Sequence, residues 1–277
     1  MNLILEPDKA GARVLCLGTF DGVHLAHKVL LKKSVLFAHE LGIKLRVCTF
    51  LRHPAEIVSP KTAPRQLTDQ LEKLAQLVSM EPDEIEMLPF TRETAKMEPE
   101  AFLEQLRQRF DLKAVCVGWN YTFGRDGRGT VRMLRADGEK YGYRVMELTP
   151  VKTDAGEIIS SSEIRKKLEA GEIQEAEKML GRPYFLVGTV CHEKKKSEAE
   201  GRMVVSIPVE PKKMLPGPGT YAGLLGLGET LPCVVTVPDA MASRKWRRVE
   251  IRLKDGSTVG NRKIERLTFQ QKIIAQA

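Results

Sequence analysis

Two histidines, His24 and His27, stand three residues apart, and this pairing is the feature of the sequence that points most directly to chemistry. Residues three apart share one face of a helix. Imidazoles can donate hydrogen bonds to phosphate oxygens without being consumed, and backbone N–H groups at a helix N-terminus add to such a site. The spacing therefore predicts a site that stabilises a phosphate group during its transfer.

The surrounding residues 15–31 (LCLGTFDGVHLAHKVLL) predict the elements that position this pair. An apolar run over residues 14–17 indicates a short buried strand, which ends at Gly18 in a polar turn. Helical periodicity follows, with apolar residues at Val23, Ala26, Leu30 and Leu31. A strand, a Gly-containing turn and a helix together present backbone N–H groups to a phosphate.

The pattern Gly-x-Phe-Asp-Gly-x-His-x-x-His resembles the signature of the nucleotidylyltransferase superfamily, and the whole stretch resembles bacterial FAD synthetases. That family usually joins an FMN adenylyltransferase module to a riboflavin kinase module. The resemblance implies that His24 and His27 are catalytic; the alternative is a pair of exposed helix histidines. It also implies four ATP-binding residues in the turn: Gly18, Phe20, Asp21 and Gly22. Ala26 stands where the family has Gly, but an added methyl group favours the helix, so we expect the site to persist.

Two further loops resemble the flavin side of that family's site. Residues 49–54 (TFLRHP) resemble a Phe-x-Pro-His-Pro loop, with Arg52 in place of proline, so we expect a less rigid backbone. Residues 118–125 (GWNYTFGR) follow a predicted strand and resemble a flavin loop, in which an amide and an aromatic ring suit a flat heterocycle. The implied flavin-binding residues are Phe50, His53, Pro54, Asn120 and Phe123. His53 could equally be an ordinary loop residue, and Arg125 and Arg128 either close over phosphates or form a surface turn.

A second helix start follows at residues 159–165 (ISSSEIR), which resemble the motif that closes the adenylyltransferase site in this superfamily. Serine hydroxyls cap helices and leave N–H groups available to anions. By the resemblance, Ser160, Ser161 and Ser162 bind ATP and Arg165 neutralises the departing β,γ-phosphates.

The order of elements predicts an α/β fold with a doubly wound parallel sheet, because strands and helices alternate along residues 14–148. We expect helices at about 24–40, 69–78, 99–110 and 131–141, and further strands at 45–50, 85–88, 113–117 and 143–148. In the second of these helices Thr68 is the predicted N-cap, and four apolar residues are predicted to face the core: Leu71, Leu74, Leu77 and Val78. Gly171 and Gly181 are predicted C-caps of two short helices.

We predict two domains, an adenylyltransferase domain over residues 1–183 and a small antiparallel β-barrel over 184–277. The second resembles the riboflavin kinase module, including LPGPGTYA at 215–222, but its chemistry is predicted to be lost. Val204 stands where a Mg²⁺-ligating threonine is expected, within the GRMVVS frame at 201–206, and valine has no oxygen to offer a hard cation. Ser206 replaces an asparagine, the segment after the candidate base Glu250 is shortened to residues 254–256, and the lysines at 194–196 are predicted to form a solvated turn.

Composition limits the partners. The net charge of +8 fits anionic ligands in general, and no aromatic-rich signature favours a nucleic-acid partner. No apolar run is long enough for a bilayer span, and the start lacks a signal-peptide pattern. Five cysteines with no Cys-x-x-Cys pair predict reduced thiols, neither a protein metal cluster nor a disulfide framework, and a cytoplasmic location. Oligomeric state stays open, a homo-oligomer included.

The resemblance implies one reaction: ATP and FMN give FAD and pyrophosphate, with Mg²⁺ accompanying ATP and no protein nucleophile. Three alternatives remain. The barrel could retain kinase activity, which would make the enzyme bifunctional; the fold could serve a non-catalytic flavin- or RNA-binding regulator; or the acceptor could be another phosphorylated or carboxylate-bearing cofactor precursor. Retention of both histidines and Arg165 argues against the regulator.

Overall fold

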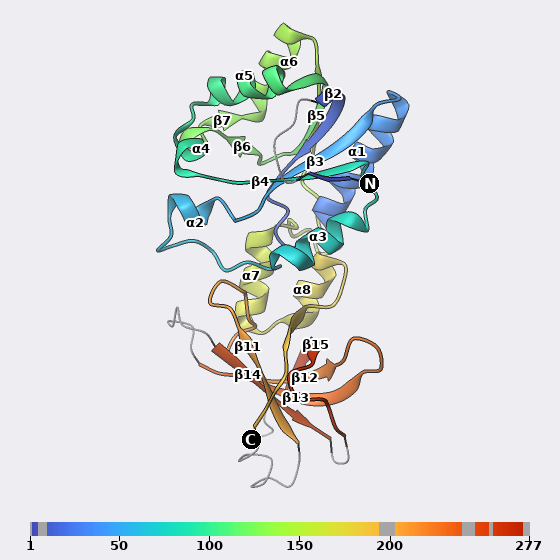
Figure 1. Ribbon diagram of the computed structural model, residues 1–277, viewed down its shortest axis with the longest axis vertical. Helices are drawn as coiled ribbons and strands as arrows, with labels where there is room; N and C mark the ends of the chain where they lie inside the picture. Colours follow the sequence, from blue (N-terminus) through green and yellow to red (C-terminus); the bar gives the residue numbers. More distant parts are fainter. Residues whose placement is uncertain (1, 5–9, 194–202, 240–246, 255–256, 274–277) are drawn as a thin grey trace. The chain divides into compact units, whose positions relative to one another are not determined.

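The structure is a computed structural model that describes residues 2–4, 10–193, 203–239, 247–254 and 257–273 (Figure 1). The chain divides into two compact units, Met1–Ile159 and Ser160–Ala277. Two helices that precede the barrel in sequence, α7 (Ser161–Ala170) and α8 (Ile173–Leu180), belong to the second unit. The sequence-based boundary between modules, at 183/184, stays a prediction.

The first unit is built on a six-stranded sheet whose neighbouring strands all pair in parallel, in the order β1-β4-β3-β2-β5-β8. The strands are β1 (Asn2–Ile4), β2 (Ala10–Leu17), β3 (Lys44–Phe50), β4 (Glu84–Leu88), β5 (Phe110–Gly118) and β8 (Arg144–Leu148). The helices are α1 (Leu25–Glu40), α2 (Ala55–Val58), α3 (Gln70–Val78), α4 (Arg92–Lys96), α5 (Pro99–Arg109) and α6 (Val131–Tyr141). A short hairpin, β6 (Thr122–Phe123) and β7 (Gly129–Thr130), flanks the 3-10 turn η1 (Arg125–Gly127). The predicted α/β fold is confirmed.

Helices cover both faces of this sheet (Figure 1). On one face, Leu30 and Leu31 of α1 and Leu77 of α3 pack in a cluster with strand residues such as Val47. On the other face, a second cluster joins α5 and α6 to the alternate strand residues, among them Val115. Side chains alternate between the faces of a strand, so two covered faces explain the nearly continuous apolar runs of the central strands.

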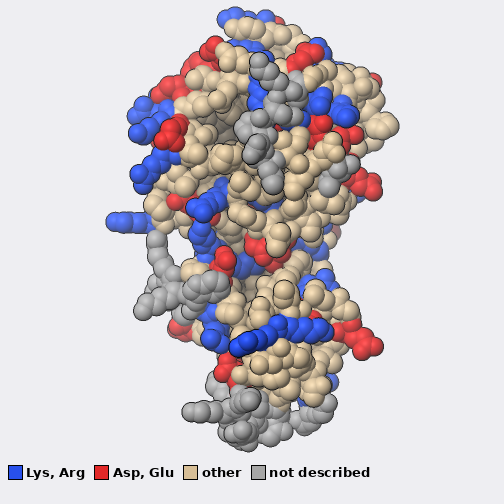
Figure 2. Space-filling view, in the orientation of Figure 1, with Lys and Arg blue, Asp and Glu red and all other residues tan. Residues whose placement is uncertain are grey.

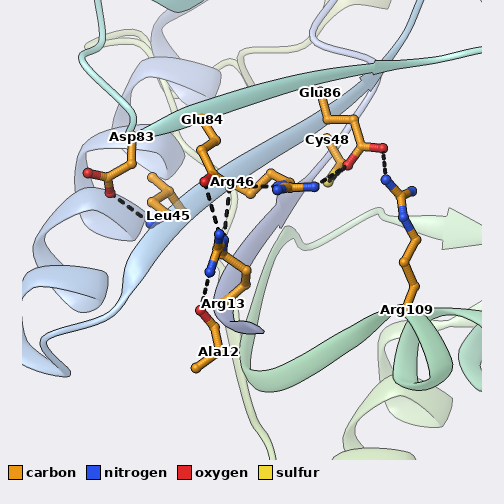
Figure 3. A network of polar contacts seen from close by, with 9 residues as sticks. All are labelled: Ala12, Arg13, Leu45, Arg46, Cys48, Asp83, Glu84, Glu86 and Arg109. Carbon is orange, nitrogen blue, oxygen red and sulfur yellow. Dashed lines mark hydrogen bonds and ion pairs between the residues drawn. The ribbon is translucent and has the colours of Figure 1, made fainter. Parts of the chain in front are cut away.

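Polar side chains cover part of the second face, over β2, β3 and β4 (Figure 3). Arg46, 1% exposed, donates from Nε to Glu84 Oε2 at 2.7 Å and from Nη1 to Glu86 Oε2 at 3.2 Å. Arg13 also bonds Glu84, and Arg109 pairs with Glu86. Burial raises the pKa of Glu84, but the bonds from Arg13 and Arg46 outweigh it and leave that pKa below its usual value. Because an unpaired buried charge is costly, a change of strand register that separated these partners would be unfavourable.

The second unit contains a seven-stranded antiparallel sheet in the order β10-β11-β14-β13-β12-β15-β9. Its strands are β9 (Phe185–Thr189), β10 (Cys191–His192), β11 (Val204–Val209), β12 (Gly219–Leu225), β13 (Leu231–Val237), β14 (Arg247–Leu253) and β15 (Ile264–Lys272). The sheet curls until β9 approaches β11, and a Cβ on Gly188 would lie only 2.5 Å from Cγ2 of Ile207. The predicted barrel is therefore nearly closed. Gly171 and Gly181 end α7 and α8 in the left-handed conformation, as predicted.

Candidate functional site

The predicted histidine pair lies at the start of α1. His24 is the N-cap residue, and its Nδ1 accepts a hydrogen bond from the backbone N–H of His27 at 3.4 Å. The two rings are stacked, with centroids 3.7 Å apart and planes 13° apart. Because Nδ1 of His24 accepts this hydrogen bond, Nε2 is the donor nitrogen of the ring.

Electrostatics keep His27 neutral. Burial, and then the neighbouring ring of His24, hold the pKa of His27 well below its usual value. Its Nδ1 is buried and has no hydrogen-bond partner within the described chain. The ring of Phe20 meets it edge-on at 5.2 Å between centroids. A neutral imidazole at a helix start can donate to a phosphate oxygen without carrying a charge of its own.

The turn that delivers these histidines has an unusual backbone. Phe20, Gly22 and Val23 have φ values of 50°, 83° and 37°, and a positive φ is rare for a β-branched residue such as valine. Buried contacts hold the turn: Asp21 accepts from the N–H of Leu67 at 2.9 Å and of Thr68 at 3.2 Å. Such strain persists where the surroundings over-determine it, and it clusters at functional sites.

The four turn residues predicted to bind ATP have little exposed side chain. Asp21 is 5% exposed and Phe20 is fully buried. Gly18 has no room for a side chain, because a Cβ there would lie 2.9 Å from the ring of Phe20. Gly22 donates its N–H to Oγ1 of Thr68 at 3.1 Å. These residues shape the start of α1, and ATP contact by them stays a prediction.

A pocket lies beside this turn, at the carboxyl ends of β2 and β3, where ligands bind in open α/β sheets. It contains three of the predicted flavin residues, Phe50, His53 and Pro54. The Nδ1 of His53 accepts from the N–H of Ala55 at 3.2 Å, so this ring also helps to start α2. The other lining residues are Thr19, Asp21, Leu51, Arg52, Gln66, Thr68, Asp69, Gln70 and Lys73.

The loop after β5 carries the other two predicted flavin residues. Asn120 is exposed in a turn that follows the strand. Phe123 is only 6% exposed and packs on Phe102, with ring centroids 5.1 Å apart. Flavin contact by either residue stays a prediction. Arg125 and Arg128 both pair with Glu98 on the surface, which fits the surface-turn alternative.

The second predicted helix start belongs to the second unit. Ser160 is the N-cap of α7, and its Oγ accepts from the N–H of Glu163 at 3.3 Å. The cap was predicted from the Ser-Ser-Ser run, and the structure confirms it. Ser161 and Ser162 form the first turn, and the half-buried Arg165 lies one turn further on.

Two details of α3 correct the sequence analysis. Thr68 is not its N-cap; Asp69 is, in a reciprocal capping box with Glu72, an Asp-x-x-Glu spacing that the sequence displays. Leu71 and Val78 do not face the core, since they are 78% and 38% exposed.

The segment from Thr68 into α3 contributes pocket residues to which the sequence analysis gave no role in the site. Lys73 is 8% exposed, and its Nζ donates to the carbonyl oxygen of Phe50 at 2.6 Å. Thr68 is buried and bonds the turn before α1. The sequence analysis assigned this segment a helix and core leucines but no role in the site.

In the barrel, the residues at the predicted kinase positions are buried or contact other residues of the barrel. Val204 is fully buried. Ser206 donates to Glu193 at 2.6 Å and accepts from Arg248 at 3.2 Å. Glu250 lies opposite Ser206 in the register of β11 and β14. The predictions for residues 194–196, 201–202 and 255–256 lie outside the described residues.

Comparison with known proteins identifies the family. A family model described as FAD synthetase matches residues 6–163, more than half of the chain. The chain belongs to the FAD synthetase family. The match includes both histidines and runs through the serines at the start of α7.

Curated relatives agree with this family. A bifunctional riboflavin kinase/FMN adenylyltransferase of Listeria monocytogenes is 32% identical over 213 residues, which cover 76% of this chain and 67% of that protein. A protein of the same description from Bacillus subtilis is 30% identical over 79% of this chain and 69% of its own length.

A solved structure described as a macrolide-efflux protein from Streptococcus pneumoniae has a TM-score of 0.83 at 22% identity. The superposition covers 98% of this chain and 90% of the Streptococcus pneumoniae chain. At this identity the likeness shows the fold alone.

Proposed function

We propose that the protein is an FMN adenylyltransferase, which transfers AMP from ATP to FMN and releases pyrophosphate. The observation that carries the proposal is the stacked pair His24 and His27 at the start of α1, with the pKa of His27 lowered by burial, in a chain of the FAD synthetase family. A phosphate oxygen of FMN attacks the α-phosphorus of ATP in line. One P–O bond forms to FMN while the bond from the α-phosphorus to the bridging oxygen breaks, and pyrophosphate leaves with that electron pair.

The protein supplies positioning and charge stabilisation, because this displacement needs no covalent intermediate. Nε2–H of His24 and the ring of His27 donate to the α-phosphate oxygens as negative charge develops on them. The N–H groups at the start of α1 favour the same anion. The buried contacts of Asp21 and Gly22 hold the turn in place before substrate arrives.

The remaining site residues are proposed in two groups. Ser160, Ser161, Ser162 and Arg165 bind the β,γ-phosphates and stabilise the leaving pyrophosphate. The residues proposed to orient the flavin are Phe50, His53, Pro54, Asn120 and Phe123. The gathering of three of these five around one pocket in the first unit supports the second group.

Magnesium is proposed to arrive as the counter-ion of ATP. Across the described ranges, no three His, Cys, Asp or Glu side chains gather where they could hold a metal ion. The carboxylate of Asp21 is already engaged by backbone N–H groups. Mg²⁺ commonly keeps its waters and binds substrate phosphates, so a dedicated protein cage is unnecessary.

We propose that the barrel does not phosphorylate riboflavin. Val204 offers no ligand atom, and Ser206 is engaged by Glu193 and Arg248. The relatives are described as bifunctional, so this is the point where the chain departs from them. Incubation of the pure protein with riboflavin, ATP and Mg²⁺ tests it: no FMN is expected, and its formation would establish a bifunctional enzyme.

The cysteines, the helices and the surface charges bear on proposals about the protein's location and partners. All five cysteines are free, four of them buried, which suits the reducing cytoplasm that we propose. No helix of the described chain has both the length and the apolar character to cross a bilayer. On the face shown in Figure 2, Lys and Arg are interspersed with Asp and Glu over each unit.

The adenylyltransferase proposal is tested by chromatographic detection of FAD after incubation of the protein with FMN, ATP and Mg²⁺. FAD is expected to form and to depend on both histidines. Flavin binding without FAD formation would favour the non-catalytic regulator. A double-mutant cycle of H27A and R165A tests whether the two residues act together. If the loss of kcat in the double variant, expressed as a free energy, is smaller than the sum of the two single losses, both residues act on one transition state.

A further inference from the structure

The segment that starts α3 joins two loops of the pocket. Thr68 Oγ1 accepts from the N–H of Gly22, in the turn before α1, at 3.1 Å. One helical turn further on, the Nζ of Lys73 donates to the carbonyl oxygen of Phe50, the last residue of β3, at 2.6 Å. One short segment therefore holds both the turn that carries the histidines and the strand end that begins the proposed flavin loop.

Lys73 is an unusual residue to find at this place. It is 8% exposed, and burying an ammonium group is costly unless polar partners replace its water. Burial lowers the pKa of Lys73, although the carboxylates of Asp21 and Glu56 act in the opposite direction. A hydrogen bond from a charged donor is among the stronger ones in proteins, so the Phe50 carbonyl is held firmly.

Gln70 reinforces this contact from the same face of α3. Its Nε2 donates to the carbonyl oxygen of Leu51 at 2.6 Å. Residues three apart on a helix are neighbours, so Gln70 and Lys73 hold two successive carbonyls. The N–H of Leu51 in turn donates to the carbonyl of Leu88 at 2.9 Å. The direction in which the chain leaves β3 is thus set by a helix that comes twenty residues later in sequence.

We propose that Lys73 is a positioning residue for FMN: through the Phe50 carbonyl it keeps residues 50–54 in the arrangement that accepts the flavin. The inference rests on the proposed function, because it takes this loop as the flavin side of the site. Apparent affinity falls in proportion to the fraction of molecules whose site is correctly arranged. Loss of the Lys73 bond therefore weakens FMN binding and leaves ATP binding unchanged.

The test compares K73M, K73R, Q70A and the matched control L71A, a change at an exposed residue of the same helix. FMN affinity is measured by quenching of flavin fluorescence, and KM values for FMN and ATP are measured in the same preparations. K73M is expected to raise the Kd and KM for FMN by about tenfold, with the KM for ATP and kcat unchanged. K73R keeps a hydrogen-bond donor and is expected to recover part of the FMN affinity that K73M loses. Q70A is expected to raise the Kd and KM for FMN less than K73M does, and L71A is expected to leave both unchanged.

Three outcomes overturn the inference. K73M could bind FMN like the unchanged protein, or it could weaken FMN and ATP equally together with a lower Tm, as a merely structural residue would. Should K73M fail to fold, Q70A decides, because its exposed side chain is not needed for packing; an unchanged FMN affinity then refutes the positioning role. If the wild-type protein neither binds FMN nor forms FAD, that result refutes the proposed function and not the role of Lys73.

Discussion

Replacing His27 by alanine tests the proposed chemistry in most depth. The ring is neutral because burial and His24 lower its pKa, so it acts as a hydrogen-bond donor and not as a fixed charge. Its Nδ1 has no partner within the described chain, and the substitution breaks no protein hydrogen bond at that atom. Loss of one preorganised donor to a developing anion costs about 2–4 kcal/mol of transition-state stabilisation. This corresponds to a fall in kcat of about 30-fold to 1,000-fold.

The assay is steady-state formation of FAD, with ATP and FMN varied separately. The KM for ATP is expected to change much less than kcat, because the contact strengthens as charge develops. The matched control is H39A, which removes an exposed histidine from the last turn of the same helix and is expected to leave kcat unchanged. If H27A and H39A both turned over at the unchanged rate, His27 would have no part in the reaction.

Further predictions concern stability. The pKa of His27 is lowered in the folded state, so its contribution to stability is present above the unfolded value of about 6.5 and is lost as pH falls below it; thermal melts should show a steeper acid loss than in H27Q. T68V removes the acceptor for the Gly22 N–H and should lower the free energy of unfolding in urea by about 1–3 kcal/mol. G129A places a Cβ against the ring of Phe123 and should cost about 1–3 kcal/mol in the same assay, and an unchanged midpoint would contradict that packing.

Local signals were sufficient to predict much of this molecule. The strand, turn and helix around His24 follow from residues adjacent in sequence, and α1 ends at Glu40 as its periodicity predicts. The Ser160 cap and the glycine ends of α7 and α8 are equally local. Element order then suffices for a parallel sheet, because strands that alternate with helices have few other ways to pair.

Contacts between distant residues could not be predicted in this way. Thr68 was expected to cap its own helix, but its hydroxyl bonds Gly22, 46 residues earlier. Lys73 reaches Phe50, 23 residues away, and a lysine in an amphipathic helix gives no sign that it is buried. Such partners are determined by tertiary packing, which local propensity does not encode.

The buried ion pairs are a second feature that the sequence pattern could not predict. Glu84 and Glu86 alternate with apolar residues in β4, a pattern typical of a strand with one solvated face. Both are buried, because Arg46 on the neighbouring strand pairs with each of them (Figure 3). A sequence pattern separates polar from apolar residues, but it does not show which charges are paired across strands.

The most direct measurement of the central claim follows isotopic label from ATP into flavin. The protein is incubated with FMN, Mg²⁺ and ATP labelled at either the α- or the γ-phosphate, and the products are separated by chromatography. Adenylyl transfer predicts α-label in FAD, γ-label in pyrophosphate, and one FMN consumed for each FAD formed. Label from the γ-phosphate in any flavin, or the absence of α-label from FAD, would contradict the account.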